Sequence, residues 1–282
     1  MRTFRNGSLE FDVRDEGPPD GPVVVLLHGF PQFNDSWNTV IPQLTSQGYR
    51  CLAPNQRGYT PGARPLRRRD YRMPLLIDDI NALIDASGAE RVHLVGHDWG
   101  AVVVWALANA HPDRLASIAP MSVPHPAAFL RALGTSRQVL SSWYIYAFQL
   151  PYVPERQLIG DGTKWQRFAK RLQASGQTHE FADRDAQRMA QDGTLTAALT
   201  WYRAAFLGNP RAYNAHTKVP TLFIWGDQDQ FCKPAGANAC GRYVDAPYQF
   251  EAVAGASHWL PEEQPDLVSK RLLQHFTAYP TR

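Results

Sequence analysis

The segment VHLVGHDWGA, residues 92–101, decides the fold of this 282-residue chain. It begins with a short strand-like run, Val92–Val95, and an apolar run that extends to Ala110 follows Gly100. The two runs predict a buried strand and a buried helix joined by a sharp turn with Asp98 at its centre. Glycines on both sides of Asp98 leave room for the strained backbone of such a turn.

Asp98 stands at the centre of the pattern glycine–any–nucleophile–any–glycine, in the strand–turn–helix context that this pattern requires. The helix that follows would direct its free N–H groups and its positive dipole end toward the turn. A carboxylate is already anionic at neutral pH, so it can attack a saturated carbon without the base that a serine needs. A residue that only caps a helix does not need two flanking glycines, and we therefore interpret Asp98 as a nucleophile.

Outward from this segment, short apolar runs alternate with helical patterns. Apolar residues from Pro74 to Gly88 have helical spacing, and Leu9–Val13 alternates like a half-buried strand after the turn Asn6-Gly7. The other strand-like runs are Val23–Leu27, Tyr49–Ala53, Leu115–Ala119, Thr221–Trp225 and Phe250–Val253. This alternation predicts an α/β fold with a mostly parallel central sheet and helices on both faces.

No strand-like run occurs in residues 125–216, where aromatic residues are separated by polar ones. We expect this stretch to be a helical cap, or lid, inserted into a core made of residues 1–124 and 217–282. Trp143, Phe148 and Trp201 are expected to pack in the core of the cap. An aromatic cap is typical of an apolar substrate site.

An ester formed on Asp98 would need a general base for its hydrolysis. His258, in a loop after a late strand, is the candidate for that base. A carboxylate must orient its imidazole, and both Asp227 and Asp229 follow the preceding strand. We prefer Asp229, because Asp227 lies in the tight turn beside a glycine, where its side chain would bond to the backbone.

The turn His28-Gly29-Phe30-Pro31 follows the central strand and can direct the N–H of Phe30 into the site. Together with the N–H of Trp99, this group would form an oxyanion hole. His97, like His28, is interpreted as a buried structural residue. The spacing of the other histidines does not suggest a metal site.

The formal net charge of +3 gives no reason to expect a nucleic-acid partner, and the basic run Arg67–Arg69 is interpreted as a solvated loop. The three cysteines, Cys51, Cys232 and Cys240, are widely spaced and predict free thiols in a reducing compartment. No apolar segment resembles a signal peptide or approaches the roughly 18 residues of a membrane span. We therefore expect a cytoplasmic protein, monomeric or homodimeric, that is not bound to a membrane.

The chain contains the motifs HGFP at 28–31, GHDWG at 96–100, GDQD at 226–229 and GASHW at 255–259. Together they resemble α/β-hydrolases of the epoxide hydrolase and haloalkane dehalogenase group, and the resemblance extends over essentially the whole chain. It implies an α/β-hydrolase fold with a nucleophile, an acid and a histidine in that order, and no metal or cofactor.

Epoxide hydrolases resemble one another in two cap tyrosines that bind the epoxide oxygen. The later one usually lies in a Trp-Tyr-Arg segment, which Tyr202 matches, and the earlier one matches Tyr144 in WYIYAFQ at 143–149, with Tyr146 as an alternative. The resemblance implies an epoxide hydrolase that converts a small apolar epoxide and water into a vicinal diol. Trp37, Phe148 and Tyr146 are expected to line the substrate site.

Two alternatives stay open. A haloalkane dehalogenase would use the same nucleophile, but Phe30 stands where that group commonly carries a halide-binding asparagine. Fluoroacetate dehalogenases share HGFPQ but carry arginines where this chain has Trp99 and Val102. The second alternative is a non-catalytic ligand-binding protein of the same fold, for which the complete set of catalytic residue types would have no use.

Overall fold

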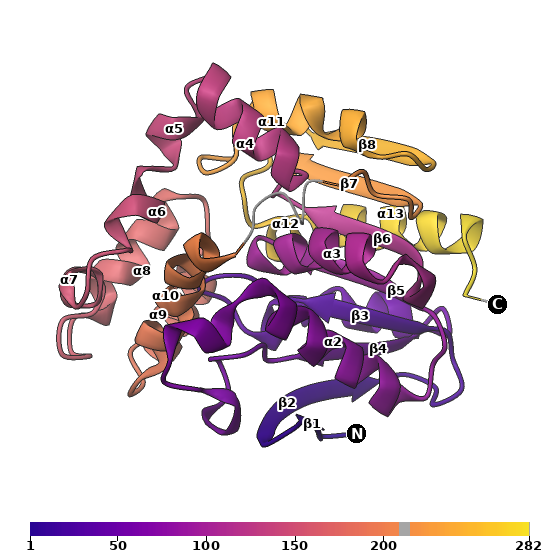
Figure 1. Cartoon of the computed structure of the whole chain (residues 1–282), viewed down its shortest axis with the longest axis horizontal. Helices are drawn as coiled ribbons and strands as arrows, with labels where there is room; N and C mark the ends of the chain where they lie inside the picture. Colours follow the sequence, from indigo (N-terminus) through magenta and orange to yellow (C-terminus); the bar gives the residue numbers. More distant parts are fainter. Residues whose placement is uncertain (209–214, 282) are drawn as a thin grey trace.

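A central sheet organises the computed structural model, which describes residues 1–208 and 215–281 (Figure 1). The eight described strands lie in the order β1-β2-β4-β3-β5-β6-β7-β8. The pairings of β1 with β2 and of β2 with β4 are antiparallel, and the others are parallel, which confirms the mostly parallel sheet. The strands are β1 (Thr3–Asn6), β2 (Leu9–Glu16), β3 (Val23–Leu27), β4 (Arg50–Pro54), β5 (Val92–His97), β6 (Leu115–Met121), β7 (Thr221–Gly226) and β8 (Tyr248–Val253).

Helices cover both faces of this sheet, and α6–α10 lie together beside one end of it (Figure 1). The helices are α1 (Ile41–Thr45), α2 (Met73–Ser87), α3 (Trp99–Ala110), α4 (Pro126–Thr135), α5 (Gln138–Ser141), α6 (Trp143–Ala147), α7 (Val153–Leu158), α8 (Trp165–Ala174), α9 (His179–Met189), α10 (Thr194–Ala204), α11 (Pro234–Ala239), α12 (Leu260–Glu263) and α13 (Pro265–Ala278). The short 3-10 helices are η1 (Asn34–Trp37), η2 (Pro61–Ala63), η3 (Arg68–Tyr71), η4 (Pro112–Arg114), η5 (Ala205–Leu207) and η7 (Cys240–Tyr243).

Strand β3 explains why both faces of the sheet need helices. All five of its residues are buried, and alternate side chains point to opposite faces. Val23, Val25 and Leu27 pack in a core cluster with residues of α2 and α3, whereas Val24 and Leu26 pack in a second cluster with residues of α1 and α13. A strand that is apolar at every position can therefore be stable only between two helical layers.

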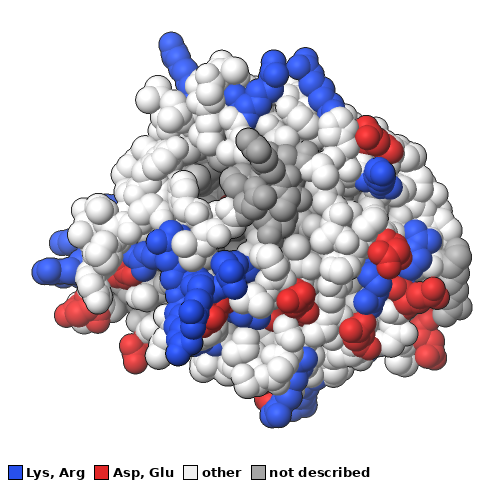
Figure 2. All heavy atoms as spheres, in the orientation of Figure 1, with Lys and Arg blue, Asp and Glu red and all other residues white. Residues whose placement is uncertain are grey.

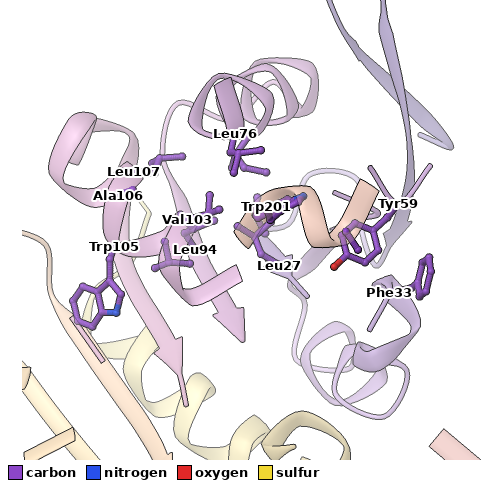
Figure 3. Close-up of a cluster of buried hydrophobic side chains, with 14 of the residues drawn as sticks. Leu27, Phe33, Tyr59, Leu76, Leu94, Val103, Trp105, Ala106, Leu107 and Trp201 are labelled. Atoms are coloured by element: carbon purple, nitrogen blue, oxygen red, sulfur yellow. The ribbon is translucent and has the colours of Figure 1, made fainter. Parts of the chain in front are cut away.

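Figure 3 shows the first of these clusters around Leu27, with Trp201 of α10 beside it. Trp201 is 2% exposed, and its indole donates a hydrogen bond to the backbone carbonyl of Arg57 at 2.8 Å. Arg57 forms a buried salt bridge with Asp79 of α2 at 2.7 Å. Helix α10 is thus anchored directly to the core.

Residues 125–216 leave the sheet after β6 and return before β7, which pairs with β6. Their described part contains helices and no strand. The first helix, α4, packs against α11, where a Cβ atom on Gly236 would lie 3.1 Å from Pro124 and 3.7 Å from Ala132. The division into a core and a cap at 125–216 stays a prediction.

The surface carries charges of both signs. Figure 2 shows Lys and Arg beside Asp and Glu on one face of the molecule. Arg67–Arg69 are exposed, as a solvated run predicts. Within the described ranges, no helix is both long and apolar enough to cross a membrane.

Candidate active site

The turn at Asp98 has a backbone conformation that is rare for a residue with a side chain. Asp98 lies between β5 and α3 with φ 51° and ψ −118°. A Cβ atom on Gly96 would overlap the carbonyl group of Gly100, and one on Gly100 would overlap the carbonyl oxygen of Leu27. Both glycines are therefore required by close backbone approach, and the turn holds the Asp98 side chain at the end of β5.

A second turn, at the end of β3, presses against the Asp98 side chain. A Cβ atom on Gly29 would overlap the Asp98 carboxyl group. The next residue, Phe30, donates its backbone N–H to Asp98 Oδ1 over an N to O distance of 2.8 Å. Trp99 begins α3, so its N–H has no carbonyl partner within the helix. The structure thus brings one of the two expected oxyanion donors to Asp98, and the other follows Asp98 in the chain.

His258 lies between two carboxylates. Its Nε2 is 3.5 Å from Asp98 Oδ2, and its Nδ1 is 2.7 Å from Asp229 Oδ2. The side chains of His258 and Asp229 are 3% and 0% exposed, whereas that of Asp98 is 13% exposed. The imidazole therefore faces Asp98 with one nitrogen and a fully buried acid with the other.

The loop after β7 places Asp229, rather than Asp227, against this imidazole. Asp229 Oδ1 accepts the backbone N–H groups of Phe231 and Cys232 at 2.7 and 2.9 Å, which leaves its other oxygen for the histidine. Asp227 is exposed and accepts the N–H of Gly255 at 2.9 Å. Its side chain makes the backbone bond that its place in the tight turn suggested.

The charges of these three side chains stabilise one another. Burial by itself lowers the pKa of His258, but the carboxylates of Asp229 and Asp98 outweigh burial and raise it to about 10. Burial raises the pKa of Asp98, but the contact with His258 and the Phe30 N–H outweigh burial, so the pKa lies below its ordinary value. At neutral pH the site therefore holds an imidazolium between two carboxylates.

An aromatic cluster lies beside these charges. The ring centroids of Tyr144 and Tyr202 are 6.0 Å apart. Tyr202 packs edge-on against Phe30 and Trp99, with centroid distances of 5.5 and 5.0 Å. Phe148, which is half-buried, lies 5.0 Å from Tyr202 and 5.6 Å from Tyr144. The structure thus brings together Tyr144, Tyr202 and Phe148, which the sequence analysis proposed separately.

Both tyrosines of this cluster stay protonated over the physiological pH range. Burial, with a further contribution from the negative charge of Asp98, raises the pKa of Tyr144 and of Tyr202 well above its ordinary value. The Trp99 indole, with its ring centroid 5.0 Å from that of Tyr202, lowers the pKa of Tyr202 but does not outweigh burial. Two phenolic O–H groups and a carboxylate are therefore available in one small region.

Two residues that we expected to line the substrate site lie elsewhere, which corrects those expectations. Trp37 is fully buried in the core cluster on the α1 and α13 face of the sheet. Tyr146 is 53% exposed. Tyr144 of α6 and Phe148, the residue that follows this helix, are four residues apart and share the inner side, so Tyr146 falls on the outer side. The same geometry corrects the expectation for Trp143, which is 65% exposed rather than packed in the cap core.

Phe231 is a further residue of this region that the sequence analysis missed. Its ring lies 4.9 Å from the imidazole of His258 and 5.7 Å from the ring of Tyr144. It comes two residues after Asp229, so an aromatic residue at that point of the acid loop was the available signal. No group of three or more His, Cys, Asp or Glu side chains within residues 1–208 and 215–281 could hold a metal ion.

A family model described as alpha/beta hydrolase fold matches residues 22–265. The chain is 36% identical over 272 residues to the AB hydrolase superfamily protein YfhM of Bacillus subtilis, and the match covers 95% of this chain and 94% of that protein. It is 33% identical over 279 residues to epoxide hydrolase 3 of Xenopus tropicalis, with 95% and 74% covered. The solved structure of epoxide hydrolase A from Mycobacterium thermoresistibile has a TM-score of 0.79 at 28% identity, with 98% of this chain and 97% of that chain covered.

Proposed function

This chain belongs to the α/β-hydrolase-fold family, and we propose that it is an epoxide hydrolase that attacks its substrate with the Asp98 carboxylate. Relatives at 33% identity that are named epoxide hydrolases support the proposal. The observation that carries it is the pair of protonated phenols, Tyr144 and Tyr202, in the aromatic cluster beside Asp98. An opened epoxide leaves an alkoxide, which needs an acid donor, whereas a halide leaves without a proton.

In the first step, an oxygen of the Asp98 carboxylate attacks a ring carbon of the epoxide. A C–O bond to Asp98 forms as the ring C–O bond breaks. Tyr144 and Tyr202 hydrogen-bond the ring oxygen, and one of the phenols transfers its proton to it. The product is a hydroxyalkyl ester of Asp98, and one tyrosine has become a tyrosinate.

His258 supplies the proton that the phenol has lost. The negative charge of Asp98 is one reason why the pKa of His258 lies at about 10, and the ester removes that charge. The pKa of His258 therefore falls when the ester forms, and its proton returns to the tyrosinate. One electrostatic change thus converts His258 from an acid into a neutral base.

In the second step, neutral His258 takes a proton from water, and the resulting hydroxide adds to the ester carbonyl carbon. Asp229 stabilises the imidazolium, and the N–H groups of Phe30 and Trp99 bind the oxyanion. The tetrahedral intermediate then breaks the ester C–O bond. The departing alkoxide takes the proton of the new carboxyl group, which yields the vicinal diol and restores the resting charges.

Two substrates distinguish this function from dehalogenation by the same nucleophile. The protein is incubated with styrene oxide and, separately, with 1-bromobutane, and diol and bromide are measured by chromatography. We expect diol from styrene oxide, at a rate that Tyr202→Phe lowers by about 10²-fold because one acid donor is lost. Release of bromide without any diol would refute the proposal in favour of a dehalogenase.

Trapping the ester tests the covalent mechanism. His258→Gln removes the base but not the nucleophile, so styrene oxide should add its own mass to the protein, on Asp98. Intact-mass measurement followed by peptide mapping detects this adduct. A His258→Gln variant that stays unmodified by a substrate of the wild-type protein would exclude the ester. Turnover by Asp98→Ala at the wild-type rate would exclude Asp98 as the nucleophile.

We also propose that residues 125–216 act as the cap that contributes Tyr144 and Tyr202 to the site. The anchoring of α10 to the core through Trp201 supports this arrangement, because Tyr202 is the next residue. We place the protein in the cytoplasm, and its three buried free cysteines, which suit a reducing compartment, support that location.

A further inference from the structure

A chain of buried polar side chains holds the backbone of the His258 loop. The carbonyl oxygen of His258 accepts hydrogen bonds from Ser122 Oγ at 2.8 Å and from His97 Nε2 at 2.7 Å. The other ring nitrogen of His97, Nδ1, lies 2.9 Å from Gln32 Oε1. Gln32 Nε2 lies 2.7 Å from Oε2 of Glu262, which is 230 residues away in the sequence. The oxygen and nitrogen of an amide have nearly the same shape, so the hydrogen-bond partners decide which of the two orientations holds.

These contacts require one proton in one of two places. A backbone carbonyl can only accept, so Nε2 of His97 must carry a hydrogen. If Nδ1 also carries one, His97 is a cation, and Gln32 directs its oxygen to His97 and its NH₂ group to an ionised Glu262. If Nδ1 carries none, the Gln32 amide is reversed, and its oxygen faces a Glu262 that must be protonated. The two arrangements differ by one proton position and one amide rotation.

The surroundings of His97 favour the neutral ring. The ring centroids of His97 and His258 are 4.9 Å apart, and His258 is already an imidazolium at neutral pH, so a second cation would be repelled. Burial also lowers the pKa of His97, to about 4. The proton is therefore on Glu262 rather than on Nδ1 of His97. Burial raises the pKa of the Glu262 carboxyl group, which agrees with this placement.

The charges that face Glu262 are balanced without its own ionisation. Arg184 of α9 donates to Glu262 at 2.6 Å and binds Asp185 at 2.8 Å. Asp35 of η1 lies 3.8 Å from Arg184 and is paired with Arg188. The guanidinium groups of Arg184 and Arg188 are thus already paired with the carboxylates of Asp185 and Asp35. Ionising Glu262 would add a third buried carboxylate, which would have to share Arg184 with Asp185.

Asp185 is the other carboxyl group in this cluster whose pKa burial raises. Its oxygens contact Arg184 Nε at 2.9 Å and Gln177 Nε2 at 2.6 Å. Arg184 can only donate, and two of its nitrogens contact Asp185 whereas one contacts Glu262, which favours an ionised Asp185. Glu262 contacts the amides of Gln32 and, at 3.3 Å, Gln177, and the oxygen of the Gln32 amide can accept a hydrogen. One proton between the two carboxyl groups is therefore best placed on Glu262.

We propose that Gln32 and Glu262 are positioning residues for the base His258. Protonated Glu262 sets the orientation of the Gln32 amide. This amide leaves His97 with its single hydrogen on Nε2, and that hydrogen holds the carbonyl of His258. The proposal rests on the proposed role of His258 in ester hydrolysis. It also connects the base to α9, because Arg184 of that helix binds Glu262.

Exchanging the side chains of Gln32 and Glu262 tests whether they position His258. Gln32→Glu places two carboxyl groups against each other, and we expect ester hydrolysis to slow by about 10- to 100-fold with ester formation unchanged. Gln32→Glu combined with Glu262→Gln restores one amide and one carboxyl group and should recover most of the hydrolysis rate. Gln43→Glu is the matched control, because Gln43 also donates to a carboxylate, Asp266 at 2.8 Å, but at the surface.

The two half-reactions are measured separately in single turnovers with styrene oxide. A Gln32→Glu variant that hydrolyses the ester as fast as the wild-type protein would refute the positioning role. So would an exchange variant that is no faster than Gln32→Glu. An equal loss in both half-reactions would also refute it, because general damage to the fold does not select the step that uses His258.

A measurement without substrate keeps this proposal separate from the proposed function. The ring ¹⁵N chemical shifts of His97 at neutral pH, assigned with a His97→Gln variant, report which nitrogens carry hydrogen. We expect a protonated Nε2 and a bare Nδ1. A doubly protonated ring would overturn the proton assignment whether or not the protein turns over an epoxide. The expected shifts in a protein without hydrolase activity would leave the buried chain in place and reject only the proposed reaction.

Discussion

Replacing Asp229 by asparagine isolates the contribution of the buried acid. The change keeps the shape of a side chain that is 0% exposed, and the asparagine oxygen can still accept the N–H groups of Phe231 and Cys232. Its NH₂ group would then face Nδ1 of His258 and donate to it. His258 would be neutral with its hydrogen on Nε2, the nitrogen that has to accept a proton from water.

The expected loss in ester hydrolysis is about 10⁴-fold, which is the effect of fixing the wrong tautomer in a serine protease triad. That loss corresponds to about 5.4 kcal/mol in the activation barrier. Ester formation uses the Asp98 carboxylate and should change much less. The pKa of His258 should fall below about 10, because Asp229 is the strongest of the charges that raise it.

The assay follows both steps in single turnovers with styrene oxide, by intact mass for the ester and by chromatography for the diol. Asp227→Asn is the control, because Asp227 is the neighbouring carboxylate of the same loop but binds only backbone and surface groups. Asp229→Asn should accumulate a long-lived ester, and Asp227→Asn should behave like the wild-type protein. Hydrolysis by Asp229→Asn within about tenfold of wild type, or an equal loss in both variants, would refute the reasoning.

The remaining predictions concern the elbow, the tyrosines and the pH dependence of stability. Gly100→Ala should lower the free energy of unfolding by about 3 kcal/mol, because the new Cβ would overlap a carbonyl of β3. Gly134→Ala, in an open position of α4, should raise the free energy of unfolding by about 0.5–1 kcal/mol. Thermal unfolding of both variants checks these values. Tyr144→Phe should slow ester formation by about 10²-fold, and the exposed Tyr146→Phe should not; equal rates in the two variants would contradict the assignment. Stability should decrease as pH falls from 6.5 to about 4, because buried histidines that protonate near 6.5 in the unfolded chain have a folded pKa of about 3 or 4; they are His28, His93, His97, His125 and His275. The raised pKa of His258 makes a contribution that is fully present below pH 6.5 and is lost as pH rises through about 10, so urea unfolding should show both slopes, and a flat profile would contradict them.

Most of the fold could be predicted from the sequence because its signals are local. The strand β3 was predicted with its observed bounds, and β5 and α3 were predicted within two residues of theirs. Continuous apolar runs identify strands that are buried on both faces, and glycines beside Asp98 identify the turn between strand and helix. The order of the strands in the sheet had no such signal, because it depends on contacts between distant segments.

The candidate site could be predicted only in part. Chain order and loop position pointed to Asp98, His258 and Asp229, and the structure brings these side chains within hydrogen-bond or ion-pair distance. The expectations for Trp37 and Tyr146 failed because residue type alone does not reveal which side of a helix or sheet a side chain occupies. An aromatic side chain suits a core and a substrate site equally well.

The sequence by itself determined the turn at Asp98 and therefore the kind of nucleophile this protein carries. Backbone sterics of a few adjacent residues decide that turn, and these residues are adjacent in the chain as well as in space. Only the tertiary structure decided what surrounds the nucleophile. Glu262 meets Gln32 across 230 residues of sequence, and Glu262 keeps its proton only because folding removes its carboxyl group from water.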